Sequence, residues 1–279
     1  MQKSFLRETA TTIMKATVVV VTIIISIISI SALYGVETEV GDGSCDIAVL
    51  PIEGVILPYH GIGDFEMVVT PETIESFMTA AENDTNIKGV LLEINSPGGT
   101  PVASQRIAER FKNSSLPVVG LVGDTAASGG YMIASAADYI VASPMSSVGS
   151  IGVTMSYVEE SKKNEEEGLT YVQLTSGKFK DTGTPNRPIT DEERTLLEAD
   201  LKIVHDEFVS IVANNRNLSI EAVQALADGS TMPGARAVAA GLVDKLGNRE
   251  TTKEIFAEVL GLTPQDISFC EYKSSFLPF

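Results

Sequence analysis

The stretch that decides the fold is Val118–Tyr131, which reads V-V-G-L-V-G-D-T-A-A-S-G-G-Y. It begins as a short apolar, β-branched run typical of a buried strand, and small residues and then a helix-like apolar segment follow. A strand, a crowded turn and a helix would set the Ser128 hydroxyl at the end of a sheet, beside backbone N–H groups. The stretch alone is equally compatible with Ser128 as a small residue in a tight turn.

The flanking sequence predicts alternating strands and helices. Upstream we expect strands over 47–56 and 87–94, and helices over Pro71–Asn83 and Val102–Lys112. Short links between strand, helix and strand favour parallel βαβ units, and hence one α/β domain. Downstream we expect strands at 139–142 and 169–175, a Gly/Ser turn and then a strand within 147–153, and helices at about 157–167, 220–227, 235–240 and 250–260. Thr190 and Glu193 form a capping box that should open a long amphipathic helix.

The N-terminal region is predicted to anchor the chain in a membrane. Residues 16–33 are uncharged and mostly apolar, about long enough to span a bilayer as a helix. Basic residues precede this run and acidic ones follow it, so the positive-inside rule leaves 1–15 in the cytoplasm and the body outside. Residues 34–45 are interpreted as a tether and 46–279 as one folded domain. The alternative is a cleaved signal peptide.

Charge and cysteine content narrow the possible partners. The formal net charge of −17 argues against nucleic-acid binding. Two histidines and two cysteines without metal-ligand spacing argue against a metal site, and no cofactor is expected. Cys45 and Cys270 could pair in an oxidising compartment, but two unrelated thiols are the favoured interpretation.

A nucleophilic serine needs a base, and the chain offers several candidates. His60 and His205 lack a supporting motif and fit ordinary surface histidines. Lys178 and Lys180 lie in the loop 176–185, and a lysine acts as a base only if its surroundings lower its pKa. The neighbouring Asp181 weakens the case unless its side chain turns away.

An oxyanion hole is predicted on the same edge of the sheet. Asn95-Ser96-Pro97-Gly98-Gly99 ends one expected strand, and Ser128-Gly129 ends the next. The carboxyl ends of parallel strands share one edge, and glycines let backbone N–H groups approach a substrate closely. This convergence favours a site over two unrelated turns.

Five motifs in order resemble the signal peptide peptidase A family of membrane-bound serine peptidases (family S49), in its short, single-domain form. The resemblance covers about residues 47–248. The motifs that carry it are Asn95–Gly99, Ala126–Tyr131, Gly149–Val153, Ser176–Asp181 and Ala237–Asp244.

The resemblance implies a Clp protease/crotonase-like spiral of ββα units behind an N-terminal transmembrane helix. It implies Ser128 as nucleophile, Lys180 as general base, Ser150 as the residue that orients the lysine, and the N–H groups of Gly98 and Gly129 as the oxyanion hole. In single-domain relatives the serine and lysine come from neighbouring subunits, so a ring-shaped homo-oligomer is expected.

The implied substrates are signal peptides left in the membrane, or other extended apolar peptides. Three alternatives stay open: a stomatin-associated Ser–Lys protease, a crotonase-type acyl-CoA enzyme, and a catalytically inactive anchored scaffold. The polar stretch Asp181–Arg187 after Lys180 does not suggest a desolvated lysine.

Overall fold

The computed structural model describes residues 14–15, 17, 20–22, 45–61 and 67–271. The chain divides into two compact units, Met1–Thr38 with Ser274–Phe279, and Glu39–Lys273. Most of the predicted transmembrane segment 16–33 and tether 34–45 lies outside the described residues; the described positions 14–15, 17 and 20–22 are helical. Within the described part of the chain, no helix combines the length and apolar character needed to cross a bilayer.

The second unit is built on a mainly parallel sheet, as predicted. Its strands are ordered β2-β1-β3-β4-β5-β8, and each neighbouring pair is parallel. Their bounds are β1 Ile47–Ile56, β2 Val68–Val69, β3 Gly89–Gly99, β4 Val118–Ala127, β5 Tyr139–Ala142 and β8 Lys245–Leu246. A further parallel strand, β9 (Phe269–Glu271), pairs with the start of β1.

The sheet divides along β4, and this division prepares the site. The first part of β4 pairs with β5 through Val119–Val122, whereas Thr125–Ala127 pair with β6 (Ser147–Gly149). β6 in turn pairs antiparallel with β7 (Thr231–Pro233). The end of β4 therefore lies beside the end of β6, with Ala127 opposite Gly149.

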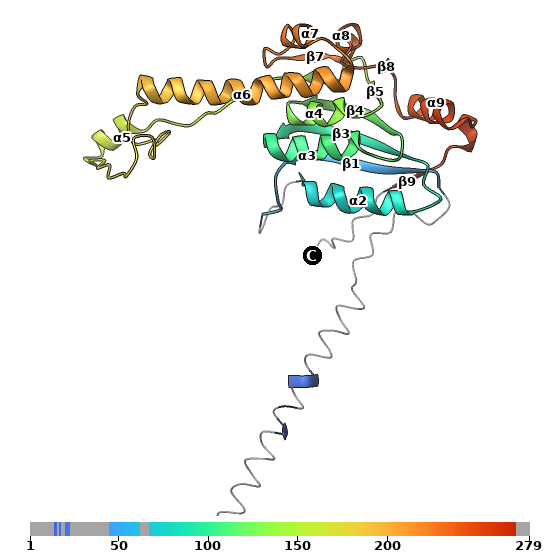
Figure 1. The fold of residues 1–279 in the computed structure, drawn as a ribbon, viewed down its shortest axis with the longest axis horizontal. Helices are drawn as coiled ribbons and strands as arrows, with labels where there is room; N and C mark the ends of the chain where they lie inside the picture. Colours follow the sequence, from blue (N-terminus) through green and yellow to red (C-terminus); the bar gives the residue numbers. More distant parts are fainter. Residues whose placement is uncertain (1–13, 16, 18–19, 23–44, 62–66, 272–279) are drawn as a thin grey trace, which may run out of the picture. The chain divides into compact units, whose positions relative to one another are not determined.

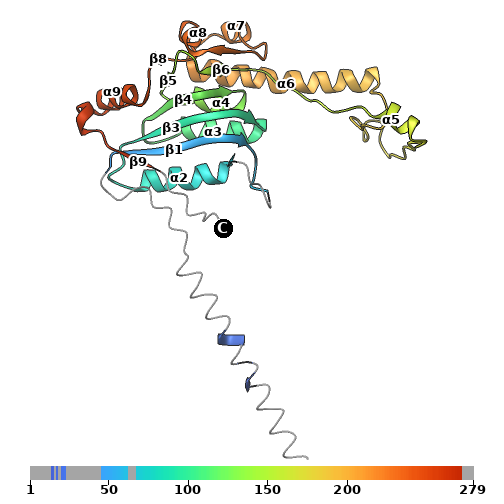
Figure 2. The same cartoon turned by 180° about the vertical axis from the view of Figure 1, so that it is seen from behind.

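Helices cover both faces of the sheet, so its central strands are apolar on both sides. α2, α3 and α4 lie along one face, and α9 lies on the other (Figures 1 and 2). In β1, Leu50 packs with the first group of helices, whereas Val49 joins the cluster that contains Phe256 of α9. The helix bounds are α2 Pro71–Asn83, α3 Pro101–Lys112, α4 Gly129–Ser135, α5 Ser161–Glu166, α6 Asp191–Arg216, α7 Ile220–Gln224, α8 Gly234–Ala239 and α9 Arg249–Leu260.

The buried apolar side chains of the long helix α6 lie in its second half. The predicted capping box is confirmed, with the Thr190 side chain accepting from the Glu193 N–H and Glu193 accepting from the Thr190 N–H. Phe208 and Val212 in its second half are buried, whereas Ile203 is exposed. In both views, α5 and the segment around it lie at the N-terminal end of α6, away from the sheet (Figures 1 and 2).

We call residues 155–190 the arm; here one predicted element does not form and another is shorter than expected. The expected strand 169–175 does not form: these residues pair with no strand of the described residues, and Leu174 is 92% exposed. The helix expected over about 157–167 forms over Ser161–Glu166. Just before the arm, the sequence predicts a turn and then a strand over 147–153, whereas in the structure the strand comes first, at Ser147–Gly149, and residues 150–153 form none. β-Branched and aromatic residues favour a strand, but a strand also needs a partner, and the described part of this chain supplies none.

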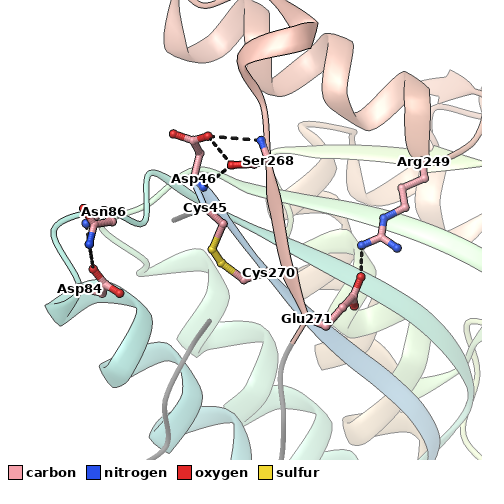
Figure 3. The surroundings of a disulfide bond; sticks show 8 residues. All are labelled: Cys45, Asp46, Asp84, Asn86, Arg249, Ser268, Cys270 and Glu271. Atoms are coloured by element: carbon pink, nitrogen blue, oxygen red, sulfur yellow. Dashed lines mark hydrogen bonds and ion pairs between the residues drawn. A yellow bond between two sulfur atoms is a disulfide. The ribbon is translucent and has the colours of Figure 1, made fainter. Parts of the chain in front are cut away.

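The two cysteines form a disulfide, contrary to the favoured interpretation of the sequence. Cys45 and Cys270 are bonded with their Cα atoms 5.7 Å apart, across a sequence separation of 225 residues. The reason is the pairing of β9 with β1, which the sequence did not reveal. Figure 3 shows Asp46 beside this bond, accepting hydrogen bonds from the N–H (3.2 Å) and hydroxyl (2.8 Å) of Ser268. An ion pair joins Arg249 of α9 to Glu271, the residue after Cys270 on β9.

Candidate active site

Ser128 is held in a strained turn between β4 and α4. Its φ of 51° and ψ of −123° are unusual for a residue with a side chain. The surroundings fix this conformation: its N–H donates to the Gly149 carbonyl at 2.8 Å, and its own carbonyl accepts from the N–H groups of Tyr131 and Met132. A serine held at such a strand-to-helix turn presents its hydroxyl instead of burying it in the helix.

The glycine pair at the end of β3 touches this turn. Gly98 has a φ of 104°, and a Cβ there would lie 2.8 Å from the Gly129 nitrogen and 2.9 Å from the Ser128 Cβ. A Cβ on Gly129 would lie 2.2 Å from the Ser104 hydroxyl oxygen. Both positions therefore require glycine, because a side chain at either would keep the end of β3 and the turn at Ser128 from approaching each other closely.

The backbone N–H groups of Gly129 and Gly98, both near Ser128, differ in their hydrogen-bond acceptors. Gly129 is the first residue of α4, so its N–H has no acceptor within the helix. The Gly98 N–H donates to the Ser96 hydroxyl oxygen at 3.1 Å, and that hydroxyl donates to the Gly54 carbonyl at 2.7 Å. Sequence reasoning did not identify this buried role of Ser96.

A small cavity with both polar and apolar lining atoms opens beside Ser128. Its volume is about 130 Å³, and among the described residues no charged side chain lines it. The lining residues are Gly99, Pro101, Ser128, Gly129, Met132, Gly152, Val153, Thr154, Val204 and Phe208. Sequence reasoning did not assign Val204 and Phe208 to the site, because their helical spacing also fits ordinary core packing.

Ser150 follows the strand that pairs with the end of β4. Its φ is 52°, its N–H donates to the Ser230 carbonyl at 2.8 Å, and its hydroxyl donates to the Gly229 carbonyl at 3.0 Å. Because Gly149 accepts from the Ser128 N–H, the two serines lie at the same edge of the sheet.

Lys180 does not lie with these residues. It is exposed in the arm and does not line the cavity at Ser128. Within residues 45–61 and 67–271, its Nζ has no hydrogen-bond or ion-pair partner. Lys178, by contrast, pairs with Glu192 at 2.6 Å and lies over the Phe179 ring. One chain therefore does not bring Ser128 and Lys180 together.

The histidine candidates do not line the cavity either, although His205 follows the lining residue Val204 directly. His60 Nε2 lies 3.2 Å from the Thr73 hydroxyl, and His205 Nε2 lies 3.0 Å from the Ala227 carbonyl. Neither contact links a histidine to Ser128. The described residues contain no cluster of His, Cys, Asp and Glu side chains that could hold a metal ion.

Comparisons with known proteins support one family. A "Putative protease" of Methanocaldococcus jannaschii is 38% identical over 67% of this chain and 60% of its own length. A protein of Enterococcus faecium named "Putative signal peptide peptidase SppA" is 37% identical over 69% of this chain and 56% of its own length. The chain thus spans less than two thirds of the length of these relatives.

A solved structure supports the fold, and a family pattern supports the assignment. A mutant of the membrane-bound stomatin-specific protease 1510-N matches with a TM-score of 0.54 and 17% identity, over 83% of this chain and 99% of that one. At this identity the match shows the fold alone. The family described as Peptidase family S49 matches residues 110–263, more than half of the chain and including both Ser128 and Lys180. The chain belongs to peptidase family S49.

Proposed function

We propose that this chain is a serine endopeptidase with a Ser–Lys dyad, Ser128 as nucleophile and Lys180 as general base. The observation that carries the proposal is the strained Ser128 beside Gly98, Gly129 and a small cavity, in a member of a peptidase family. The division of the sheet along β4 fits the Clp protease/crotonase-like spiral that the family resemblance implies.

The chemistry follows from these groups. Neutral Lys180 removes the proton of the Ser128 hydroxyl as its oxygen attacks a peptide carbonyl. The resulting oxyanion accepts hydrogen bonds from the N–H groups of Gly129 and Gly98, and the latter exchanges its bond to Ser96 for one to the oxyanion. Lys180 then protonates the leaving amine, and water hydrolyses the acyl-enzyme. Ser150 is proposed to orient the lysine amine.

The dyad is proposed to form between subunits of a ring. In one chain Lys180 is carried by the arm, while Ser128 lies on the sheet. Apolar side chains on the arm are largely exposed, among them Val172 at 71% and Leu174 at 92%. Exposed apolar groups of this kind mark surfaces that pack against another chain, so a second copy would cover the arm and receive its lysine.

The proposed substrates are extended apolar peptides, including remnant signal peptides. A cavity lined by Met132, Val153 and Phe208 without charged side chains suits an apolar residue next to the cleaved bond. The name of the Enterococcus faecium relative points to the same substrates. We propose a single-pass anchor at 16–33 with the body outside the cytoplasm, and the Cys45–Cys270 disulfide supports an oxidising compartment.

Single substitutions in the full chain test this proposal. Cleavage of a fluorogenic apolar peptide should fall by at least about a thousandfold in Ser128→Ala and in Lys180→Ala, because each removes half of the dyad. Lys178→Ala, two residues away and engaged with Glu192, is the matched control and should stay near wild type. A Ser128→Ala protein as active as wild type would contradict the proposal.

A further inference from the structure

Asp181 follows the proposed base directly, yet its carboxylate is bonded elsewhere. Its Oδ2 accepts a hydrogen bond of 2.6 Å from the Tyr171 hydroxyl, and the Arg187 Nε lies 3.9 Å from the same oxygen. Among the described residues, no ion pair joins Asp181 to Lys180. Two groups from different parts of the arm therefore hold the carboxylate away from the lysine.

Arg187 is itself fixed by the start of α6. Its two terminal nitrogens donate to the two carboxylate oxygens of Glu193 at 2.6 and 2.9 Å. Glu193 is 2% exposed and also accepts from the Thr190 N–H at 2.9 Å. The Arg187 guanidinium holds the pKa of the Glu193 carboxyl well below its usual range, so this pair stays charged at neutral pH.

The arrangement matters because a lysine acts as a base only when it is neutral. A carboxylate within a few ångströms stabilises the ammonium form and raises the lysine pKa. Asp181 can supply such a carboxylate by a change of side-chain rotamer, since it is the next residue. The interactions that keep Asp181 from pairing with Lys180 therefore determine how readily Lys180 can act as a base.

We propose that Tyr171 is a positioning residue: with Arg187, it sequesters the Asp181 carboxylate so that Lys180 has no anionic partner. This inference rests on the proposed function, since it assumes that Lys180 is the base. It also gives the segment 169–175, which does not form the predicted strand, a role within its own chain.

The charges around the two residues are consistent with this role. Asp181 faces Tyr171 and Arg187, with Glu193 behind the arginine. The nearby carboxylate of Glu192 is paired with Lys178. The bond to Asp181 raises the pKa of the Tyr171 hydroxyl, so the tyrosine remains a donor throughout the neutral range.

The test is the pH dependence of kcat/KM for cleavage of an apolar peptide, measured on the full chain. The variants are Tyr171→Phe, Asp181→Asn and the double substitution. Tyr157→Phe is the matched control, since Tyr157 is an arm tyrosine that is 39% exposed. Lys180→Ala is included to show whether Lys180 is the base at all.

We expect Tyr171→Phe to reduce kcat/KM at pH 7 by about tenfold and to move the half-maximal pH upward by about one unit, as the freed carboxylate pairs with Lys180. Asp181→Asn in the Tyr171→Phe background should restore the profile to within about twofold of wild type, because no carboxylate remains to pair with the lysine. If Tyr171 only stabilised the arm, Asp181→Asn would not restore the activity lost in Tyr171→Phe.

Two results would overturn the inference. One is a double variant as impaired as Tyr171→Phe alone, and the other is a Tyr171→Phe profile that superimposes on wild type. Full activity in Lys180→Ala would instead refute the proposed function itself, so the two failures are distinguishable.

Discussion

The sheet edge around Ser128 and the arm around Lys180 differ in how far a single chain completes them. At the sheet edge the backbone is bonded on both sides of Ser128, and Gly98 and Gly129 fit without space for a Cβ. On the arm, apolar side chains such as Leu174 face solvent, and the segment 169–175 pairs with no strand among residues 45–61 and 67–271. The part of the proposed site that holds Ser128 is complete within one chain. The arm that carries Lys180, by contrast, has no surface of its own described chain to pack against.

The difference has a physical basis in packing. The sheet edge is stabilised by the core on both faces, where β3 and β4 are covered by α3, α4 and α9. The arm is tied together mainly by polar contacts, chiefly the buried Glu193 with Arg187 and the Thr190 cap. Polar contacts can fix a loop locally, but they leave its apolar side chains exposed.

The largest effect on activity and assembly is expected when a charged residue replaces an exposed apolar residue of the arm. Leu174→Asp should reduce peptidase activity by more than tenfold and shift the protein to smaller assemblies, because a buried unpaired carboxylate disfavours the interface. Sedimentation velocity and peptide cleavage on the same samples measure both effects.

Met145→Asp is the control for that experiment. Met145 is 88% exposed but belongs to the sheet unit outside the arm, so activity and assembly should remain near wild type. If Leu174→Asp retained full activity and the wild-type sedimentation coefficient, the arm could not be the subunit contact.

A smaller effect, on stability alone, is expected at the opposite edge of the sheet. The Cys45–Cys270 bond lies at the start of β1, whereas the candidate site lies at the carboxyl ends of β3 and β4. Replacing both cysteines by serine should lower the free energy of unfolding by about 2–4 kcal/mol, since the bond closes a long loop. Activity at 25 °C should be unchanged.

Urea denaturation of the wild type and the double serine variant measures this difference. Wild type treated with a reductant should behave like the variant. A variant as stable as oxidised wild type would show that pairing of β9 with β1 suffices without the bond.

Most of the strands and helices around the sheet could be predicted from the sequence, because the patterns that mark them are local. Thr70 and Pro71 open α2, the box at Thr190 and Glu193 opens α6, and the apolar run at Val118 forms β4. Local signals also placed Ser128 and the glycine pair at one edge of a parallel sheet.

The remainder depends on long-range contacts that no local pattern encodes. The pairing of β9 with β1 determines whether Cys45 meets Cys270. The segment 169–175 has the residue types of a strand, but whether a strand forms depends on a neighbour. The bond between Tyr171 and Asp181 likewise joins residues across a loop whose path the sequence does not indicate.

The most direct test of the central claim is complementation between two inactive variants. Ser128→Ala and Lys180→Ala proteins, carrying different affinity tags, are mixed under conditions that allow subunit exchange, and the doubly tagged assembly is assayed. If the dyad is shared between subunits of a ring, random mixing should restore about one quarter of wild-type activity, because that share of sites pairs an intact serine with an intact lysine. A doubly tagged assembly with no activity above either parent would contradict the shared dyad.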